Sequence, residues 1–257
     1  MGILFLHILA WILLHISGLK TSNWNLLYGL SYGFIPLFGG FVGVLLAKPW
    51  GGLKSVIGRA MIFVSVGSIS WGIGSCIWSY YNFFLHVGVP YPSIADVGYI
   101  LAIPFWCLGM VNLSIATGVK FALRRTLGKI FIFLIPMSII ALSYYILVII
   151  ARGGVLSDTL HDYLKLFFDL AYPIGDVLIV TFALVIFGLS FSYFSGRYRL
   201  AIVILLAGYV FMYMADFLFS YTTTLNTYFN GDWPDLFFPI ALSLMIVGVF
   251  GFALKES

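Results

Sequence analysis

The sequence predicts an all-α membrane protein, a bundle of about eight transmembrane helices, and two observations carry that prediction. Of the 257 residues, 62% are hydrophobic and only 9% are charged, which is far from the balance of a soluble domain. Apolar runs of roughly eighteen residues or more recur along the chain, and this is the length that an α-helix needs to cross a bilayer. We therefore expect residues 1–257 to form a single domain embedded in lipid.

Eight hydrophobic stretches follow one another along the chain: 2–18, 24–47, 60–86, 96–117, 130–151, 163–190, 200–223 and 235–253. The first is predicted as a helix and not as a signal peptide, because it has neither a basic segment in front of it nor a small-residue cleavage site. Cys76 and Cys107 fall in the middle of the third and fourth stretches, where buried free thiols are the usual finding.

The basic residues predict how the helices are oriented. Ten of the thirteen lysines and arginines fall on one side of the eight stretches: Lys48, Lys54, Arg59, Lys120, Arg124, Arg125, Lys129, Arg197, Arg199 and Lys255. Lys20, Arg152 and Lys165 fall on the other. Because basic residues accumulate on the cytoplasmic side, both termini are predicted in the cytoplasm of a cell-membrane protein. The basic residues are spread over short loops and form no patch, so nucleic acid is not an expected partner.

The stretch 163–190 differs from ordinary membrane sequence because it contains two acids. Asp169 and Asp176 are seven residues apart and share one helix face with Tyr172. They lie roughly 8 Å and 18 Å below the start of the stretch, in a hydrocarbon layer of about 30 Å. An ionised Asp at the centre of a membrane helix costs about 2.5 to 3.5 kcal/mol, so both are expected to face the protein interior and to be functional.

Asp216 lies in the interior of the seventh stretch, about 9 Å from its outer end. Tyr209, Met212, Tyr213 and Ser220 share its face. A helix cap cannot explain an acid at this position. We expect Asp169, Asp176 and Asp216 to face one internal cavity in the outer half of the bundle.

Other acids stand where helices begin on the outer side. Ser93 precedes Asp96 by three residues, as Thr159 precedes Asp162 and Asp232 precedes Asp235. This spacing is typical of an N-cap, in which a small side chain and an acid bind free amides in the first turn. Capping is therefore the expected role of Asp96 and Asp235.

Aromatic and polar residues at helical spacing extend the expected cavity to the third and fourth stretches, which carry Trp71, Ser75, Trp78 and Asn82, then Tyr99 and Trp106. The predicted ligand-binding residues are Asp169, Tyr172, Asp176, Asp216, Tyr213, Trp78, Asn82, Asp96 and Tyr99. The segment 78–99 also has the same layout as 217–239: an aromatic helix end, a polar turn, a proline and a capping acid. This echo favours helical hairpins and an internal duplication, which is common where ligands bind between repeats.

Three motifs resemble a known family. The segments PYPSIADVGYILAIPF, AYPIGDVLIV and ADFLFSYTTTLNTYFNGDWPDLFF are similar to the multi-pass N-terminal region that precedes GGDEF and EAL domains in some bacterial cyclic-di-GMP signalling proteins. The resemblance covers about residues 24–253 and implies a membrane sensor. This sequence carries no effector domain after its last stretch, so the expected output is a separate cytoplasmic effector protein and not cyclase activity.

The favoured hypothesis is a ligand-binding or sensory module whose outward-facing pocket holds a small cationic or amphiphilic molecule, in a chain that also suits a homo-oligomer. An intramembrane lipid hydrolase is the enzyme alternative, with Asp169, Asp176 and Asp216 sharing acid and base roles; the lysoplasmalogenase family offers a fold-level analogy. A proton-coupled transporter is the third hypothesis. No cofactor or metal is expected, because no lysine occupies a span interior and the stretch with His7 and His15 has no partner helix that carries histidines.

Overall fold

The structure is a computed structural model that describes residues 2–19, 22–119, 126–151, 153–154, 163–190 and 198–253. Within these ranges it contains eight α-helices and no strand: α1 (Gly2–Ile16), α2 (Asn23–Leu46), α3 (Val56–Ser79), α4 (Ile94–Ala116), α6 (Thr126–Tyr144), α7 (Tyr163–Ser190), α8 (Tyr198–Thr224) and α9 (Trp233–Gly251). Single π-helical turns, Tyr80–Phe84 and Tyr145–Ile150, extend α3 and α6. The all-α prediction is confirmed. When the two π-helical turns are counted with α3 and α6, every predicted span begins and ends within four residues of the observed helix.

Seven of these helices are long and apolar enough to cross a membrane, so the chain is a multi-pass membrane protein. The remaining predicted span, 2–18, corresponds to α1, which has only 15 residues. At about 1.5 Å per residue it is roughly 22 Å long, less than the ~30 Å of a bilayer core. The expectation of about eight spans is thus met by seven full-length helices and one short one.

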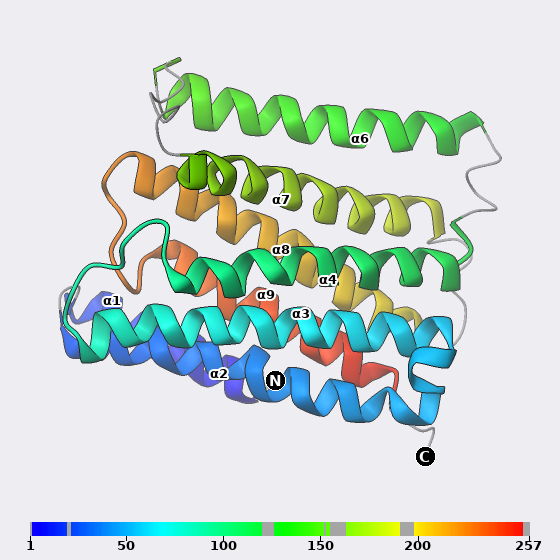
Figure 1. The fold of residues 1–257 in the computed structure, drawn as a ribbon, viewed down its shortest axis with the longest axis horizontal. Helices are drawn as coiled ribbons and strands as arrows, with labels where there is room; N and C mark the ends of the chain where they lie inside the picture. Colours follow the sequence, from blue (N-terminus) through cyan, green and yellow to red (C-terminus); the bar gives the residue numbers. More distant parts are fainter. Residues whose placement is uncertain are drawn as a thin grey trace.

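Six helices form a closed ring in the order α2, α3, α4, α7, α8, α9 and back to α2. In Figure 1, α2 lies at the bottom of the ring and α7 at the top, with α3 and α4 in front of α8 and α9. The two peripheral helices flank the ring, α1 against α2 and α9, and α6 against α7. The ring therefore has two halves, α2 to α4 and α7 to α9, which meet where α2 contacts α9 and where α4 contacts α7.

Glycines let the two hairpins of the ring pack closely. A Cβ atom on Gly98 of α4 would lie 2.6 Å from the backbone nitrogen of Gly74 of α3, and one on Gly248 of α9 would lie 2.7 Å from that of Leu205 of α8. Small residues at such crossings are typical of membrane helices, because packing rather than water exclusion holds them together. The helices of the α3–α4 and α8–α9 hairpins are thus in close backbone contact.

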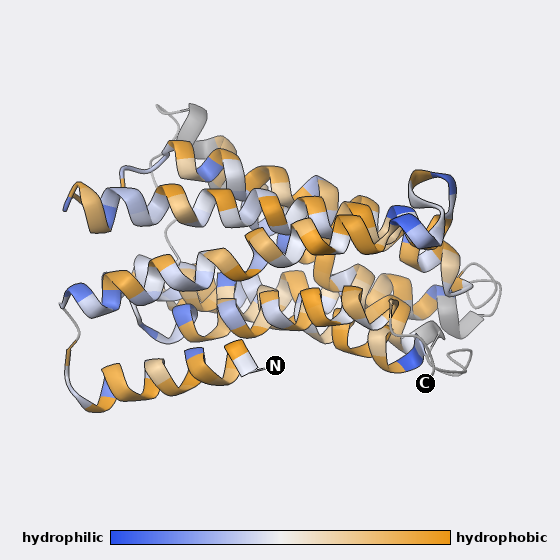
Figure 2. Ribbon diagram, turned by 90° about the horizontal axis from the view of Figure 1, so that it is seen from below, coloured by the Kyte–Doolittle hydropathy of each residue, from blue (hydrophilic) through white to orange (hydrophobic). Residues whose placement is uncertain are grey.

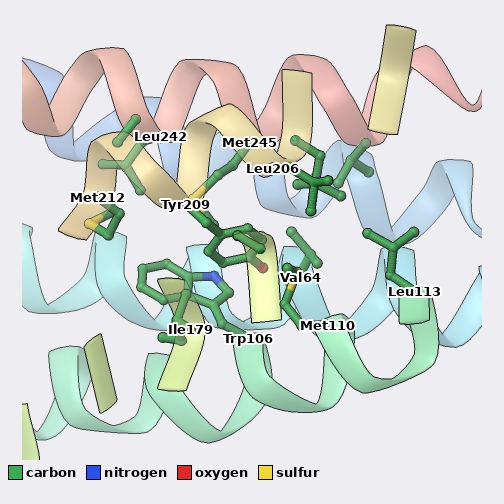
Figure 3. Packing of buried hydrophobic residues seen from close by; sticks show 14 of the residues in the cluster. Val64, Trp106, Met110, Leu113, Ile179, Leu206, Tyr209, Met212, Leu242 and Met245 are labelled. Atoms are coloured by element: carbon green, nitrogen blue, oxygen red, sulfur yellow. The ribbon is translucent and has the colours of Figure 1, made fainter. Parts of the chain in front are cut away.

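The core of the ring is apolar, and its outer surface is apolar as well. Met110, Leu205, Leu242 and Met245 are among the fully buried side chains, and Figure 3 shows several of them from facing helices packed together. Hydrophobic residues run along most of each helix in Figure 2, and many large ones are exposed, including Phe38 at 63%. A surface of this kind suits lipid tails, so the chain lies in a bilayer.

Candidate functional site

A cavity of about 390 Å³ lies inside the ring, in the half of the bundle where α3 and α8 end and α4 and α9 begin. This end is on the left in Figure 1. Four carboxyl groups line the cavity: Asp96, Asp176, Asp216 and Asp235. Ten aromatic rings line it too: Tyr32, Trp71, Trp78, Tyr91, Tyr99, Trp106, Tyr172, Phe219, Tyr228 and Phe238. Its described lining contains neither lysine nor arginine, so the acids have no fixed counter-charge there.

Asp96 is held by both of its oxygens. It stands in the first turn of α4, where the backbone N–H of the N-cap residue Ser93 donates to its Oδ2 at 2.7 Å and the Ser93 hydroxyl donates to the same atom at 3.0 Å. The Tyr172 hydroxyl of α7 donates to its Oδ1 at 2.9 Å. The predicted cap is therefore present, and the same carboxyl group also reaches the cavity.

Asp235, in the first turn of α9, likewise accepts hydrogen bonds at both carboxyl oxygens and reaches the cavity. The backbone N–H of Gly231 and the Tyr228 hydroxyl donate to its Oδ2, and the Tyr32 hydroxyl of α2 donates to its Oδ1 at 2.9 Å. Burial and the adjacent Asp235 carboxylate raise the pKa of Tyr228, a loop residue, well above its ordinary value, so this hydroxyl remains a donor. The expected cap differs in one detail, since the Asp232 side chain makes no cap hydrogen bond.

The two tyrosine–aspartate pairs join the two halves of the ring reciprocally. Tyr32 of α2 binds Asp235 of α9, while Tyr172 of α7 binds Asp96 of α4. In each pair, a carboxyl group on the last helix of one half accepts a hydrogen bond from a tyrosine hydroxyl on the first helix of the other half. Both contacts cross the seams at which the halves meet, so the seams are polar at the level of the cavity.

Asp176 of α7 and Asp216 of α8 form a different kind of pair. Their side chains are hydrogen-bonded to each other, and no other donor among the described residues binds either carboxyl group. Two carboxyl groups can share a hydrogen bond only when one proton lies between them. With a single shared proton the pair has a charge of minus one, and it lies deeper in the bundle than the helix-capping acids.

Stacked and edge-on rings build the walls. The Trp71 ring lies 5.3 Å from the Tyr99 ring and 5.2 Å from the Phe238 ring, measured between centroids. Phe219 lies edge-on to Tyr228 at 4.9 Å, and the Trp78 indole N–H donates to Asn230 Oδ1 at 3.4 Å. Rings from α3, α4, α8 and α9 are thereby locked against one another, which gives the cavity a rigid aromatic lining.

Of the α4 residues that line the cavity, Trp106 lies deepest, and we call this end of the cavity its floor. The Trp106 side chain packs against Tyr209, as Figure 3 shows. Their rings are 6.1 Å apart and edge-on. Both side chains are almost completely buried, and neither Trp106 Nε1 nor the Tyr209 hydroxyl has a hydrogen-bond partner among the described residues. The floor of the cavity is therefore held by apolar contacts alone, although Trp106 Nε1 and the Tyr209 hydroxyl are polar atoms.

Six of the nine residues predicted to bind a ligand line this cavity: Trp78, Asp96, Tyr99, Tyr172, Asp176 and Asp216. Tyr213 is not among the lining residues; its hydroxyl is hydrogen-bonded to Ser143 of α6 at 2.6 Å. Asn82 lies in the π-helical turn after α3 and donates to the Trp78 carbonyl. Asp169 belongs to α7, but its side chain lies outside the described residues, as does the cap predicted at Thr159 to Asp162.

Sequence reasoning assigned Asp235 a capping role alone and passed over Tyr32, Tyr91 and Tyr228. The spacing before Asp235 explains its amide contact, but its second oxygen meets a tyrosine 203 residues away in the sequence. The signal that could have found it is the echo between 78–99 and 217–239, since that alignment pairs Asp235 with Asp96. Tyr32 carries no such signal, because one tyrosine in an apolar helix is ordinary.

The three stretches that carry the family resemblance all reach the cavity. The first contributes Tyr91, Asp96, Tyr99 and Ile103, the second contributes Tyr172 and Asp176, and the third contributes lining residues from Asp216 to Phe238. Within the described part of the chain, no three His, Cys, Asp or Glu side chains lie close enough to hold a metal ion. Comparison with protein-family models, with curated proteins and with solved structures finds no match for this chain.

Proposed function

We propose that the protein is a ligand-binding module of the cell membrane whose cavity takes one small organic molecule. The observation that carries this proposal is the cavity itself: about 390 Å³, lined by ten rings and four carboxyl groups. Ligand sites have volumes of about 300 to 1,000 Å³, mostly apolar walls and a few placed polar groups. A cavity with this lining between two halves of a membrane bundle suits a compact, partly aromatic ligand.

The ligand would enter from outside the cell. The basic residues of the described connection between α2 and α3, Lys48 and Lys54, stand at the end of the bundle opposite the cavity. Since basic residues favour the cytoplasmic side, the cavity belongs to the outer half. A molecule dissolved in the external medium or in the outer leaflet would then reach it directly.

A sensory role extends this proposal. The resemblance to membrane regions ahead of GGDEF and EAL domains implies a sensor, and its three motifs contain most of the residues that line the cavity. A bound ligand would bridge α4, α7, α8 and α9, and so stabilise one arrangement of the two halves. We propose that a separate effector protein, or a second copy of the chain, responds to that arrangement on the cytoplasmic side.

A proton-coupled transporter is the second candidate, and the hydrogen bond between Asp176 and Asp216 favours it. A buried acid pair that holds one proton is a usual element of a proton relay. The lipid hydrolase has less support, because the described lining contains no His or Cys to act with the acids. Release of fatty acid or head group from added lysophospholipid by the wild type, but not by Asp176→Asn, would replace binding with hydrolysis.

Filling the cavity tests the proposal. Ser220 lines it from α8, while Met214 of the same helix is 40% exposed on the outer surface. We expect native mass spectrometry of the wild type and of Met214→Phe to show the same bound small molecule after gentle extraction, and Ser220→Phe to have lost it. The proposal is wrong if Ser220→Phe folds and carries the same small molecules as the wild type.

A further inference from the structure

We propose that the Asp176–Asp216 pair recognises the positive end of an organic cation, and that each cation bound displaces one proton from the pair. The inference rests on the proposed function and specifies its ligand class. It makes the cavity a site of exchange between an organic cation and a proton.

The partners of the four acids single out this pair. Asp96 and Asp235 accept hydrogen bonds at both oxygens, from backbone amides on one side and tyrosine hydroxyls on the other. Their charges are thereby compensated within the protein. Asp176 and Asp216, in contrast, have only each other among the described residues. Of the four acids on the cavity wall, these two have oxygens that remain available to a ligand.

The charges balance on exchange. With one shared proton the pair carries one negative charge, and after that proton leaves it carries two. A bound monocation restores the net charge of the site to minus one, and the proton leaves through the cavity to the medium. Displacement is favourable because a cation between two carboxylates removes the repulsion that makes them share a proton.

The walls suit the apolar part of such a cation. Trp71, Trp106, Phe219 and Phe238 line the cavity together with the pair. The faces of aromatic rings attract organic cations, and aromatic cages are the usual sites for quaternary ammonium groups. Because the described lining contains no lysine or arginine, no side-chain cation occupies the position that the ligand would take.

The other ionisable groups near the Asp176–Asp216 pair either form hydrogen bonds or lie in apolar surroundings. Tyr213 of α8 lies close to Asp176 and bonds to Ser143 of α6. Other titratable groups that line the cavity or pack beside its lining in the described structure include Tyr32, Cys76, Tyr91, Asp96, Tyr99, Cys107, Tyr172, Tyr209, Tyr228 and Asp235. The tyrosines among them that touch carboxyl groups act as donors, and Asp96 and Asp235 accept hydrogen bonds from backbone amides. The shared proton of the pair is therefore the one that a cation displaces.

Calorimetry with benzyltrimethylammonium tests the exchange, because this compound has a fixed charge and no proton of its own. Titrations of the protein in lipid nanodiscs, in phosphate and in Tris buffer, give the number of protons released per cation. We expect one proton at pH 7 and a dissociation constant that rises about tenfold for each pH unit of acidification while one proton is exchanged. Its neutral isostere neopentylbenzene should give a much smaller thermal stabilisation.

The variants separate exchange from folding. In Asp176→Asn and Asp216→Asn the remaining carboxylate keeps one charge and the new amide can still donate to it, so both should fold and bind the cation. They should release no proton, and their affinity should not change with pH. Asp232→Asn removes a nearby acid that does not line the cavity and should release one proton as the wild type does.

The inference would be overturned if the wild type binds the cation without releasing a proton. It would also be overturned if Asp176→Asn and Asp216→Asn release as many protons per cation as the wild type. Stronger stabilisation by the neutral isostere would also overturn it, while leaving the proposed function intact. If neither compound binds, the inference fails, and the mass-spectrometric comparison of Ser220→Phe with Met214→Phe decides whether the proposed function fails with it.

Discussion

At Asp96 and Asp235, one carboxyl group serves a helix end and the cavity at the same time. The amide contact fixes one oxygen and leaves the other for a tyrosine from the opposite half of the ring. Buried carboxylates without such partners are unfavourable in an apolar medium. The capping geometry therefore makes it possible to keep two charged groups on the cavity wall at small energetic cost.

Tyr32 and Tyr209 provide a matched test of this view, because both are buried tyrosines in the core. Tyr32 donates to Asp235, whereas the Tyr209 hydroxyl has no partner in the part of the chain that the structure describes. Tyr32→Phe should lower the free energy of unfolding by about 1.5 to 3 kcal/mol, the usual contribution of a hydrogen bond to a charged group. Tyr209→Phe should leave it unchanged or raise it. Thermal unfolding in detergent measures both, and equal losses in the two variants would show that the Tyr32 bond contributes nothing specific.

The acids could be predicted at the scale of the residue, but their partners could not. Asp176 and Asp216 are conspicuous because a carboxyl group inside an apolar run is unfavourable unless it faces the protein interior. Tyr32 is invisible in the same reasoning, since its role depends on a helix at the other end of the chain. Tyr213 was expected in the cavity from its place on the face of Asp216, but its hydroxyl is hydrogen-bonded to α6.

The hairpins α3–α4 and α8–α9 are the elements that position the aromatic walls. Their close crossings bring Trp71 against Tyr99 and keep Phe219 beside Tyr228. Both crossings depend on glycines that have no room for a side chain. A methyl group added at one of these glycines would push the two helices of its hairpin apart and would therefore move several of the lining rings together.

Gly98→Ala should disrupt the α3–α4 hairpin, because the added Cβ would lie 2.7 Å from the Cα of Gly74, a backbone atom that cannot turn aside. Gly29→Ala is the matched control, since Gly29 is also in a helix and has no atom within 4 Å of such a Cβ. We expect much less folded protein from Gly98→Ala in fluorescence-detected size-exclusion chromatography, and a normal yield from Gly29→Ala. A normal, monodisperse peak for Gly98→Ala would contradict the close crossing.

Helix positions were predictable because long apolar runs have few alternatives in a bilayer. The span 163–190 coincides with α7. The sequence could not show that α1 stops short of a full span, because its apolar run continues to the glycine at position 18, where the backbone turns to a φ of 66°. The π-helical turns after α3 and α6 were equally beyond prediction, because the residue types in these segments do not distinguish a π-turn from an α-turn.

In the whole molecule, two three-helix halves close a ring around the cavity. The echo between 78–99 and 217–239 indicated matching hairpins, and the structure contains hairpins at both places, with matching Tyr–Asp contacts across the seams. The contacts of α2 with α9 and of α4 with α7 could not be predicted, because they join helices far apart in the chain. The Asp176–Asp216 pair has no acidic counterpart in the first half, so the cavity is chemically one-sided.

The orientation of the whole bundle is a prediction from its basic residues. Thr227 is exposed in the loop between α8 and α9, and Lys54 is exposed between α2 and α3. In a parent protein with Cys76 and Cys107 replaced by alanine, a membrane-impermeant maleimide added to intact cells should label Thr227→Cys. Lys54→Cys should react only after the cells are permeabilised. The reverse pattern would place the cavity on the cytoplasmic side.

Anomalous diffraction from crystals grown with 4-bromobenzyltrimethylammonium tests most directly whether the cavity is a binding site. The bromine peak locates the ligand without reference to any variant. We predict one bromine in the cavity among the rings of α3, α4, α8 and α9, with the ammonium group turned toward Asp176 and Asp216. A structure at saturating ligand with no bromine in the cavity, or with bromine only on the lipid-facing surface, would contradict the account.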